Sequence, residues 1–169
     1  AVSLLLDDEH ELIQLVINSL RNDLRQSLDS NAPECHCLAL GLLSNLGAGQ
    51  FMEELCPMVT ELMVDAAMKP FVRKKAALCL VNMTRRQGDA DMLNAAEMVG
   101  HVLQILDTSN NLGLCTAVMS LMVSLTSRSQ EGWDEAPRVV ISLLTRTRQN
   151  ERNFAKGYTY FQIPSPWIQ

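Results

Sequence analysis

Three segments of this chain share one short pattern: a small residue, then an apolar residue, then a second apolar residue three positions further on. The segments are Ala39-Leu40 with Leu43, Ala77-Leu78 with Val81, and Ala117-Val118 with Leu121. Their alanines lie 38 and then 40 residues apart. Such a period fits a recurring pair of helices, and a small residue lets neighbouring backbones approach closely. The pattern therefore predicts a helix pair that recurs along the chain, with each alanine in the second helix of its pair.

Helix-starting and helix-breaking residues divide the chain at intervals that match this recurrence. Asp8 with Glu11 fits a capping box, and Pro33 suits the first turn of a helix. Pro57 is expected to kink or split the helix that contains it. The short connections predict that successive helices are antiparallel neighbours. We expect seven helices: from Asp8 towards Asp29, from Pro33 to Gly47, at about 50–66, 70–86 and 91–106, from the 107–110 turn to 127, and at about 135–148.

The composition supports the same fold class. Leu, Ala and Met are abundant and suit helices, whereas aromatic residues, which favour strands, make up 5% of the chain. We predict an all-α fold of the HEAT/armadillo type, a solenoid of about three to four helix pairs, with a compact helical bundle as the alternative. From Gln149 onward the sequence is typical of an extended connector that leads into another helix. Residues 1–169 are expected to be a single section of a longer repeat array, interrupted at both ends.

Charge and hydropathy argue against two classes of partner. The net charge of −5 repels a phosphate backbone, so nucleic-acid binding is not expected. No apolar run approaches the roughly 18 residues that a membrane-spanning helix needs. The start of the chain lacks the basic region of a signal peptide.

The five cysteines do not suggest a metal centre. Cys35-His36-Cys37 is the densest group of ligand-type side chains, but consecutive residues of a helix point about 100° apart and cannot converge on one ion. We interpret the cysteines as reduced, buried thiols, and His36 as a histidine at the boundary of the core.

No residue pattern indicates catalysis. His10 and His101 have no nucleophile motif beside them, and the phosphate-binding and metalloprotease motifs are absent from the sequence. We predict a protein that is not an enzyme, has no cofactor or metal and takes no small-molecule substrate.

One basic cluster, Arg73-Lys74-Lys75, is a candidate contact for an anionic surface, with Arg85 and Arg86 as an extension. A solvated helix face is the commoner explanation of such a cluster, and we favour it.

Four strings carry a resemblance to a known family: Ile17-Asn18-Ser19-Leu20-Arg21-Asn22-Asp23-Leu24, Leu38-Ala39-Leu40, Arg73-Lys74-Lys75-Ala76-Ala77-Leu78-Cys79-Leu80, and Tyr158-Thr159-Tyr160-Phe161-Gln162-Ile163-Pro164-Ser165-Pro166-Trp167. In order and spacing they resemble the middle of the trunk of the adaptins, the large subunits of clathrin adaptor complexes. The third string is shared by the alpha and gamma classes. The fourth resembles the connector of the alpha class.

The resemblance implies a specific role. Alpha-class adaptins are right-handed helical solenoids in the plasma-membrane adaptor, beside a beta-type large chain, a medium chain and a small chain that the solenoid cradles. The complex recruits clathrin and gathers cargo at coated pits in endocytosis. The family's basic phosphoinositide site lies near the start of the full-length trunk, where this sequence has no matching segment, so we carry over no lipid-binding residue.

The resemblance therefore predicts a non-enzymatic scaffold for vesicle-mediated protein transport, cytoplasmic and peripheral on the plasma membrane through the whole complex. The stretches 85–95 and 128–153 match the family weakly. Two alternatives stay open: a gamma-type adaptin or coat subunit at Golgi or endosomal membranes, and an armadillo-type nuclear transport receptor. The second lacks support because no tryptophan recurs with the repeat.

Overall fold

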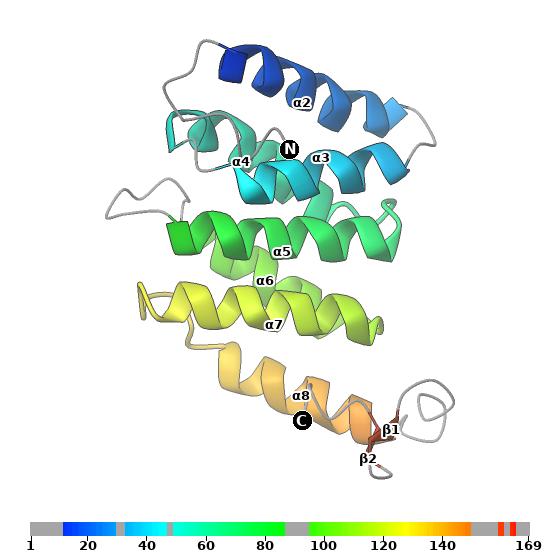
Figure 1. Cartoon of the computed structure of the whole chain (residues 1–169). Coiled ribbons are helices and arrows are strands. Elements are labelled where there is room, and N and C mark those ends of the chain that lie inside the picture. The colour runs from blue at the N-terminus through cyan, green and yellow to red at the C-terminus, as the bar shows by residue number, and fades with distance from the viewer. Residues whose placement is uncertain are drawn as a thin grey trace. The chain divides into compact units, whose positions relative to one another are not determined.

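The computed structural model describes residues 12–29, 33–46, 49–86, 95–149, 159–160 and 163–164. These residues form seven helices and one short pair of strands (Figure 1). The helices are α2 (Leu12–Asp29), α3 (Pro33–Asn45), α4 (Gly49–Val64), α5 (Pro70–Arg86), α6 (Ala95–Thr108), α7 (Leu112–Thr126) and α8 (Ala136–Gln149). The all-α prediction is confirmed, and α5 has the predicted bounds.

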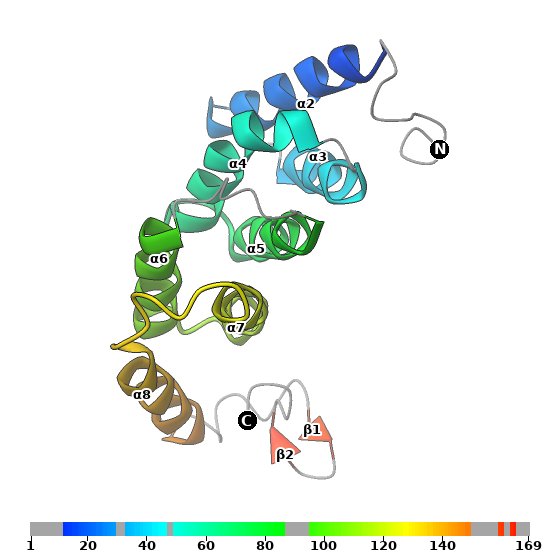
Figure 2. The same ribbon diagram turned by 90° about the vertical axis from the view of Figure 1, so that its left-hand side faces the viewer.

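The chain divides into two compact units, residues 1–94 and 95–169. In the first unit, α2 and α4 form one layer and α3 and α5 form the other, as Figure 2 shows. Helix α2 packs on α3 and α4, while α5 packs on the same two helices. Helices therefore pack on their next-but-one neighbours. This arrangement is that of stacked helix pairs and differs from an up-and-down bundle.

Helices α3 and α5 run in the same direction. Nη1 of Arg86, the last residue of α5, donates a hydrogen bond of 3.0 Å to the carbonyl oxygen of Leu46, which directly follows α3. The two C-terminal ends are therefore adjacent, and the residues that they bring together lie 40 positions apart. The prediction of antiparallel neighbours for every successive pair was too broad, because α3 packs chiefly on α2 and α5.

Side chains from all four helices fill the core of the first unit. Large residues that are almost completely buried come from each layer: Ile17, Leu24, Leu40, Leu55, Leu62, Met63 and Leu80. Full burial of such a side chain stabilises the fold by roughly 1.5–3 kcal/mol relative to exposure. An ion pair between Arg21 of α2 and Glu54 of α4 also links the two helices of the first layer.

The second unit is built from α6, α7 and α8. Helix α6 packs on both α7 and α8 (Figure 2). A turn joins α7 to α8; in it Gly132 has φ +80°, and Trp133 is buried with Nε1 donating to the carbonyl oxygen of Ser129 at 3.2 Å. The three pairs α2/α3, α4/α5 and α6/α7, followed by α8, agree with the predicted number of helix pairs in the part of the chain that the structure describes.

Several local predictions fare differently. The capping box of Asp8 and Glu11 lies outside the described residues. Of the two outcomes expected at Pro57, a split does not occur: α4 continues from Gly49 to Val64 with Pro57 inside it. The cap of α7 is Asn111, one residue beyond the predicted turn: its Oδ1 accepts a hydrogen bond of 2.9 Å from the backbone N–H of Leu114.

The segment after Gln149 contains β1 (Thr159–Tyr160) and β2 (Ile163–Pro164), which pair antiparallel with Tyr160 opposite Ile163. These strands agree with extended backbone in the predicted connector. The helix that was expected to follow lies outside the described residues.

The burial pattern corrects the register of the sequence repeat. Ala39, Leu40 and Leu43 are buried, as are Ala117, Val118 and Leu121, but Leu78 of the middle segment is 38% exposed. The buried residues of α5 that match Ala39, Leu40 and Leu43 are Cys79, Leu80 and Met83. The offset from α3 to α5 is therefore 40, not 38, in agreement with the hydrogen bond between Arg86 and Leu46.

Candidate functional site

The predicted basic cluster lies in the first two turns of α5, but its three members differ in environment. Arg73 is half-buried: its Nε donates to the carbonyl oxygen of Met63 at 2.9 Å, and its Nη2 lies 3.5 Å from that of Val64. These carbonyls belong to the last turn of α4, the negative end of that helix. Arg73 therefore holds the end of α4, whereas Lys74 and Lys75 are exposed.

Lys75 reaches across to α3. Its Cε lies 3.8 Å from the point where a Cβ on Gly41 would stand, so the lysine stem passes close to α3 where the glycine has no side chain. The charge of Lys75 also affects the thiol of Cys37, a half-buried residue of α3. Burial raises the pKa of Cys37, and the Lys75 ammonium opposes that rise. Lys75 therefore lies over the boundary between α3 and α5.

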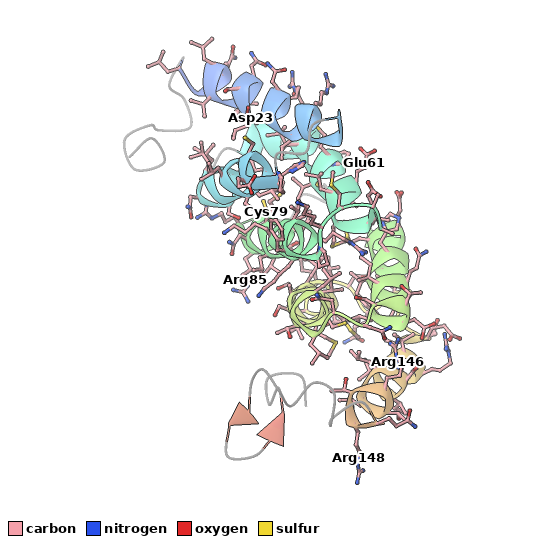
Figure 3. The ribbon with its side chains drawn as sticks, turned by 90° about the vertical axis from the view of Figure 1, so that its right-hand side faces the viewer. Asp23, Glu61, Cys79, Arg85, Arg146 and Arg148 are labelled. Atoms are coloured by element: carbon pink, nitrogen blue, oxygen red, sulfur yellow. The ribbon has the colours of Figure 1, made fainter. Side chains whose placement is uncertain are left out.

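Arg85 and Arg86 do not extend the cluster as one patch. They occupy the last turn of α5, and at about 1.5 Å of rise per residue they are roughly 15 Å from Lys75. The guanidinium of Arg86 is bound to the carbonyl of Leu46, while Arg85, labelled in Figure 3, is exposed.

The second unit contains a matching contact that sequence reasoning missed. Arg146 of α8 donates from Nη2 to the carbonyl oxygen of Leu106 in the last turn of α6, at 2.6 Å. The separation is again 40 residues. Arg148, two residues further on, is exposed and extends away from α8 in Figure 3. Both 40-residue separations equal the repeat period, and this coincidence is the signal in the sequence that could have identified the pairs.

The Cys35-His36-Cys37 group does not converge, and its members were partly misassigned. Cys35 is exposed, Cys37 is half-buried, and His36 is 2% exposed instead of lying at the boundary. Because residues 36, 39, 40 and 43 face the core with helical spacing, residue 35 must point outward. Among the described residues neither ring nitrogen of His36 has a hydrogen-bond partner, and burial lowers the pKa of the imidazole.

The other cysteines are buried thiols, as predicted. Burial is the main reason that the pKa of Cys56 in α4 and the pKa of Cys79 in α5 are each raised to about 11. A thiol with so high a pKa is neither a nucleophile nor a ready metal ligand near neutral pH. Among the described residues no group of three His, Cys, Asp or Glu side chains is placed to hold a metal ion.

These observations describe helix pairs whose polar groups hold helix ends together, with one exposed basic surface and no assembled reaction centre in the described residues. The profile of the adaptin N terminal region matches residues 1–169, which is the whole chain. The chain belongs to the adaptin family. Adaptins are non-catalytic subunits of adaptor complexes, so the chain is not an enzyme.

Similar adaptins occur in Arabidopsis thaliana and Dictyostelium discoideum. The chain is 36% identical to AP-2 complex subunit alpha-1 of Arabidopsis thaliana over 167 residues, which is 99% of the chain and 16% of that protein. It is 31% identical to AP-2 complex subunit alpha-2 of Dictyostelium discoideum over 169 residues, again 16% of that protein. Identity with AP-4 complex subunit epsilon of Arabidopsis thaliana is 28% over 169 residues, or 17% of that protein. This adaptin chain is thus AP-2 alpha-like and spans about a sixth of the length of these relatives.

The helices of this adaptin segment do not have the length and hydropathy of a membrane span, as far as the structure describes them. The resemblance to the alpha class, first carried by four short strings, now extends over the full sequence.

Proposed function

We propose that this chain is a section of the trunk of an AP-2-type clathrin adaptor complex, in which it acts as a scaffold for cargo selection and coat assembly in endocytosis. The observation that carries the proposal is the similarity to AP-2 alpha subunits over the whole chain. The stacked helix pairs support it, because such arrays present long surfaces to partner proteins. The partners are the small, medium and beta-type large chains of the complex.

The proposal includes a place in the cell and a place in a longer chain. The complex is cytoplasmic and peripheral on the plasma membrane at clathrin-coated pits, and it reaches the membrane as an assembly. Residues 1–169 form one section of a right-handed repeat trunk that continues on both sides. The 16% share of the relatives' length supports the longer trunk.

Co-expression tests the scaffold role. The complete parent chain should co-elute with the matching small adaptor chain on size-exclusion chromatography at a mass equal to their sum. An unrelated small adaptor chain of another complex is the control. Separate elution of the parent chain and its matching small chain would contradict the proposal.

A second candidate is the alternative left open by the resemblance, a subunit of an adaptor at Golgi or endosomal membranes. The similarity to AP-4 complex subunit epsilon favours a subunit of an adaptor complex other than AP-2. Localisation of the tagged full-length protein separates the two. Fluorescent puncta at the cell surface support the AP-2-type role, while enrichment at internal membranes supports the alternative. The adaptin match leaves no specific observation in favour of a nuclear transport receptor.

A further inference from the structure

The outer face of α3 and α5 combines exposed apolar and basic side chains. The two helices are parallel, and their buried residues correspond at an offset of 40: His36 with Ala76, Ala39 with Cys79, Leu40 with Leu80, and Leu43 with Met83. By the same correspondence Leu78 is the counterpart of Leu38, and neither belongs to the core. Leu38 is 74% exposed and Leu78 is 38% exposed. Two leucines on neighbouring helices therefore face solvent together.

Helix α5 adds a continuous stripe to this face. Phe71, Lys74, Lys75 and Leu78 follow the spacing i, i+3, i+4 and i+7, which places them on one side of a helix. Phe71 is 48% exposed. Because Lys75 extends over Gly41, the basic charge lies between the two leucine-bearing helices. We call Leu38, Gly41, Phe71, Lys74, Lys75 and Leu78 the α3–α5 outer surface.

The charge of this surface is opposite to that of the chain. Helix α5 carries five basic residues and no acidic residue, although the whole chain has a net charge of −5. Arg73 and Arg86 are bound to helix-end carbonyls. Within the described ranges, Lys74 and Lys75 form no hydrogen bond or ion pair. Three exposed apolar side chains gathered on one face, with two ammonium groups beside them, make this face a candidate protein-interaction surface.

We propose that the α3–α5 outer surface binds an acidic amphipathic helix of a partner protein. Leu38, Phe71 and Leu78 contact its apolar side chains, and Lys74 and Lys75 pair with its carboxylates. Axes of packed helices lie about 8–10 Å apart, so one helix laid along this face contacts both α3 and α5. The assignment rests on the first unit alone and does not require the adaptor role proposed above.

An anionic membrane fits these observations less well. Attraction to anionic lipids grows with the number of basic residues at the membrane surface, and this face provides two unpaired ammonium groups. The net negative charge of the chain repels any anionic partner, but it opposes an extended membrane surface more than a short helix whose carboxylates lie only at the two lysines. An acidic helix meets the lysines locally and also covers the leucines, so the partner of matching chemistry is a protein segment.

Fluorescence anisotropy tests the proposal with the 169-residue chain and a defined probe. The probe is a fluorescein-labelled synthetic helix of about 18 residues made of Leu, Ala and Glu, with its leucines on one face and its glutamates beside them. A matched peptide carries Lys in place of every Glu. We expect saturable binding of the acidic peptide that weakens with added salt, and no saturable binding of the basic peptide.

Variants identify the surface. Lys74→Glu combined with Lys75→Glu, and separately Leu38→Ser combined with Leu78→Ser, should each weaken binding of the acidic peptide by about tenfold or more. All four side chains are exposed, so we expect the variants to fold. A circular dichroism spectrum equal to that of the wild type checks this. Ile141→Ser and Arg148→Glu make the same kinds of change at exposed positions of α8 and should leave the affinity unchanged.

Four results would overturn the proposal. They are the absence of saturable binding by the acidic peptide, equal binding of the basic peptide, equal losses in the α8 variants, and a dimer on size-exclusion chromatography that Leu38→Ser with Leu78→Ser dissociates. The last result would assign the surface to a second copy of the chain. Co-sedimentation with phosphatidylserine vesicles that Lys74→Glu with Lys75→Glu abolishes, without peptide binding, would assign it to a membrane.

Discussion

Replacement of Arg73 by alanine should destabilise the first unit, while the same change at the adjacent Lys74 should not. The guanidinium of Arg73 donates from Nε to the carbonyl oxygen of Met63 at 2.9 Å and approaches that of Val64 at 3.5 Å. Both carbonyls are in the last turn of α4, where intrahelical donors run out. Lys74 is one residue away, carries the same charge and faces solvent.

The magnitude follows from these contacts. A hydrogen bond from a charged donor contributes about 1.5–3 kcal/mol, and the longer contact to Val64 adds little because it is at the limit of hydrogen-bond distance. A cation at a helix C-terminus adds about 0.3–1 kcal/mol. Since Arg73 is half-buried, water can replace part of both interactions. We therefore expect a loss of about 2 kcal/mol in the free energy of unfolding, or a fall in Tm of about 4–8 °C for a chain of this size. Lys74→Ala should stay within about 0.5 kcal/mol of wild type.

Urea unfolding followed by circular dichroism measures the free energy, and hydrogen exchange locates the change. Amides of the last turn of α4 and of α5 should exchange faster in Arg73→Ala, with α7 as the internal reference. Arg73→Lys should lie between wild type and alanine, because lysine keeps the charge but loses the planar fork of donors. If Arg73→Ala and Lys74→Ala unfold at the same urea concentration, the reasoning that assigns Arg73 to the end of α4 is wrong.

Three further predictions concern the rest of the chain. Arg146→Ala should lower the free energy of unfolding of the second unit by about 1–3 kcal/mol, because the hydrogen bond to the carbonyl of Leu106 is lost. Hydrogen exchange of the amides in α6 and α8 measures this loss, and an effect confined to the first unit would contradict the prediction. Burial lowers the folded-state pKa of His36 below 6.5, so the unfolded state takes up the proton first, and stability should decrease as the pH falls from about 6.5 towards the folded pKa. Urea titrations at several pH values should show that His36→Leu removes part of this decrease; an unchanged pH dependence would refute the assignment. In the native protein, iodoacetamide at mildly alkaline pH should modify the exposed Cys35 well before Cys56 and Cys79, whose pKa is about 11. Mass spectrometry of digested samples measures the order of modification, and earlier modification of Cys56 or Cys79 would contradict the prediction.

Element type and order could be predicted from the sequence because local signals determine them. Pro70 opens α5 and Arg86 ends it as predicted, and in α2 the buried residues Ile17, Leu20 and Leu24 follow the helical spacing of apolar residues in the sequence. Which side of a helix faces a neighbour depends on tertiary packing, and here the prediction was less accurate. Ala77 with Leu78 looked equivalent to Ala39 with Leu40, but α5 has several consecutive small or apolar residues, so several alignments satisfy the pattern.

The candidate site shows the same division between local and tertiary information. The sequence shows three consecutive basic residues, Arg73, Lys74 and Lys75, but only the position of α4 shows that Arg73 is bound to a helix end. The exposure of Leu38 and the burial of His36 were missed because both residues lie in a stretch where almost every position is apolar or ambivalent. In such a stretch the hydrophobic pattern does not define a single buried face.

An arginine–carbonyl contact across 40 residues occurs in each unit, and it stabilises the position of one helix end against another. In the first unit Arg86 joins the ends of α3 and α5, the second helices of their pairs, while in the second unit Arg146 joins the last turns of α6 and α8. A residue added within α5 or α8 before the arginine would rotate its side chain by about 100° and remove the guanidinium from its carbonyl, whereas one inserted in a connecting turn would leave the contact intact. Each arginine therefore stabilises one register between the two helices that it joins, in addition to the apolar core. Such contacts at helix ends help to fix the register, while exposed residues such as Lys74 and Leu38 stay on the outer face.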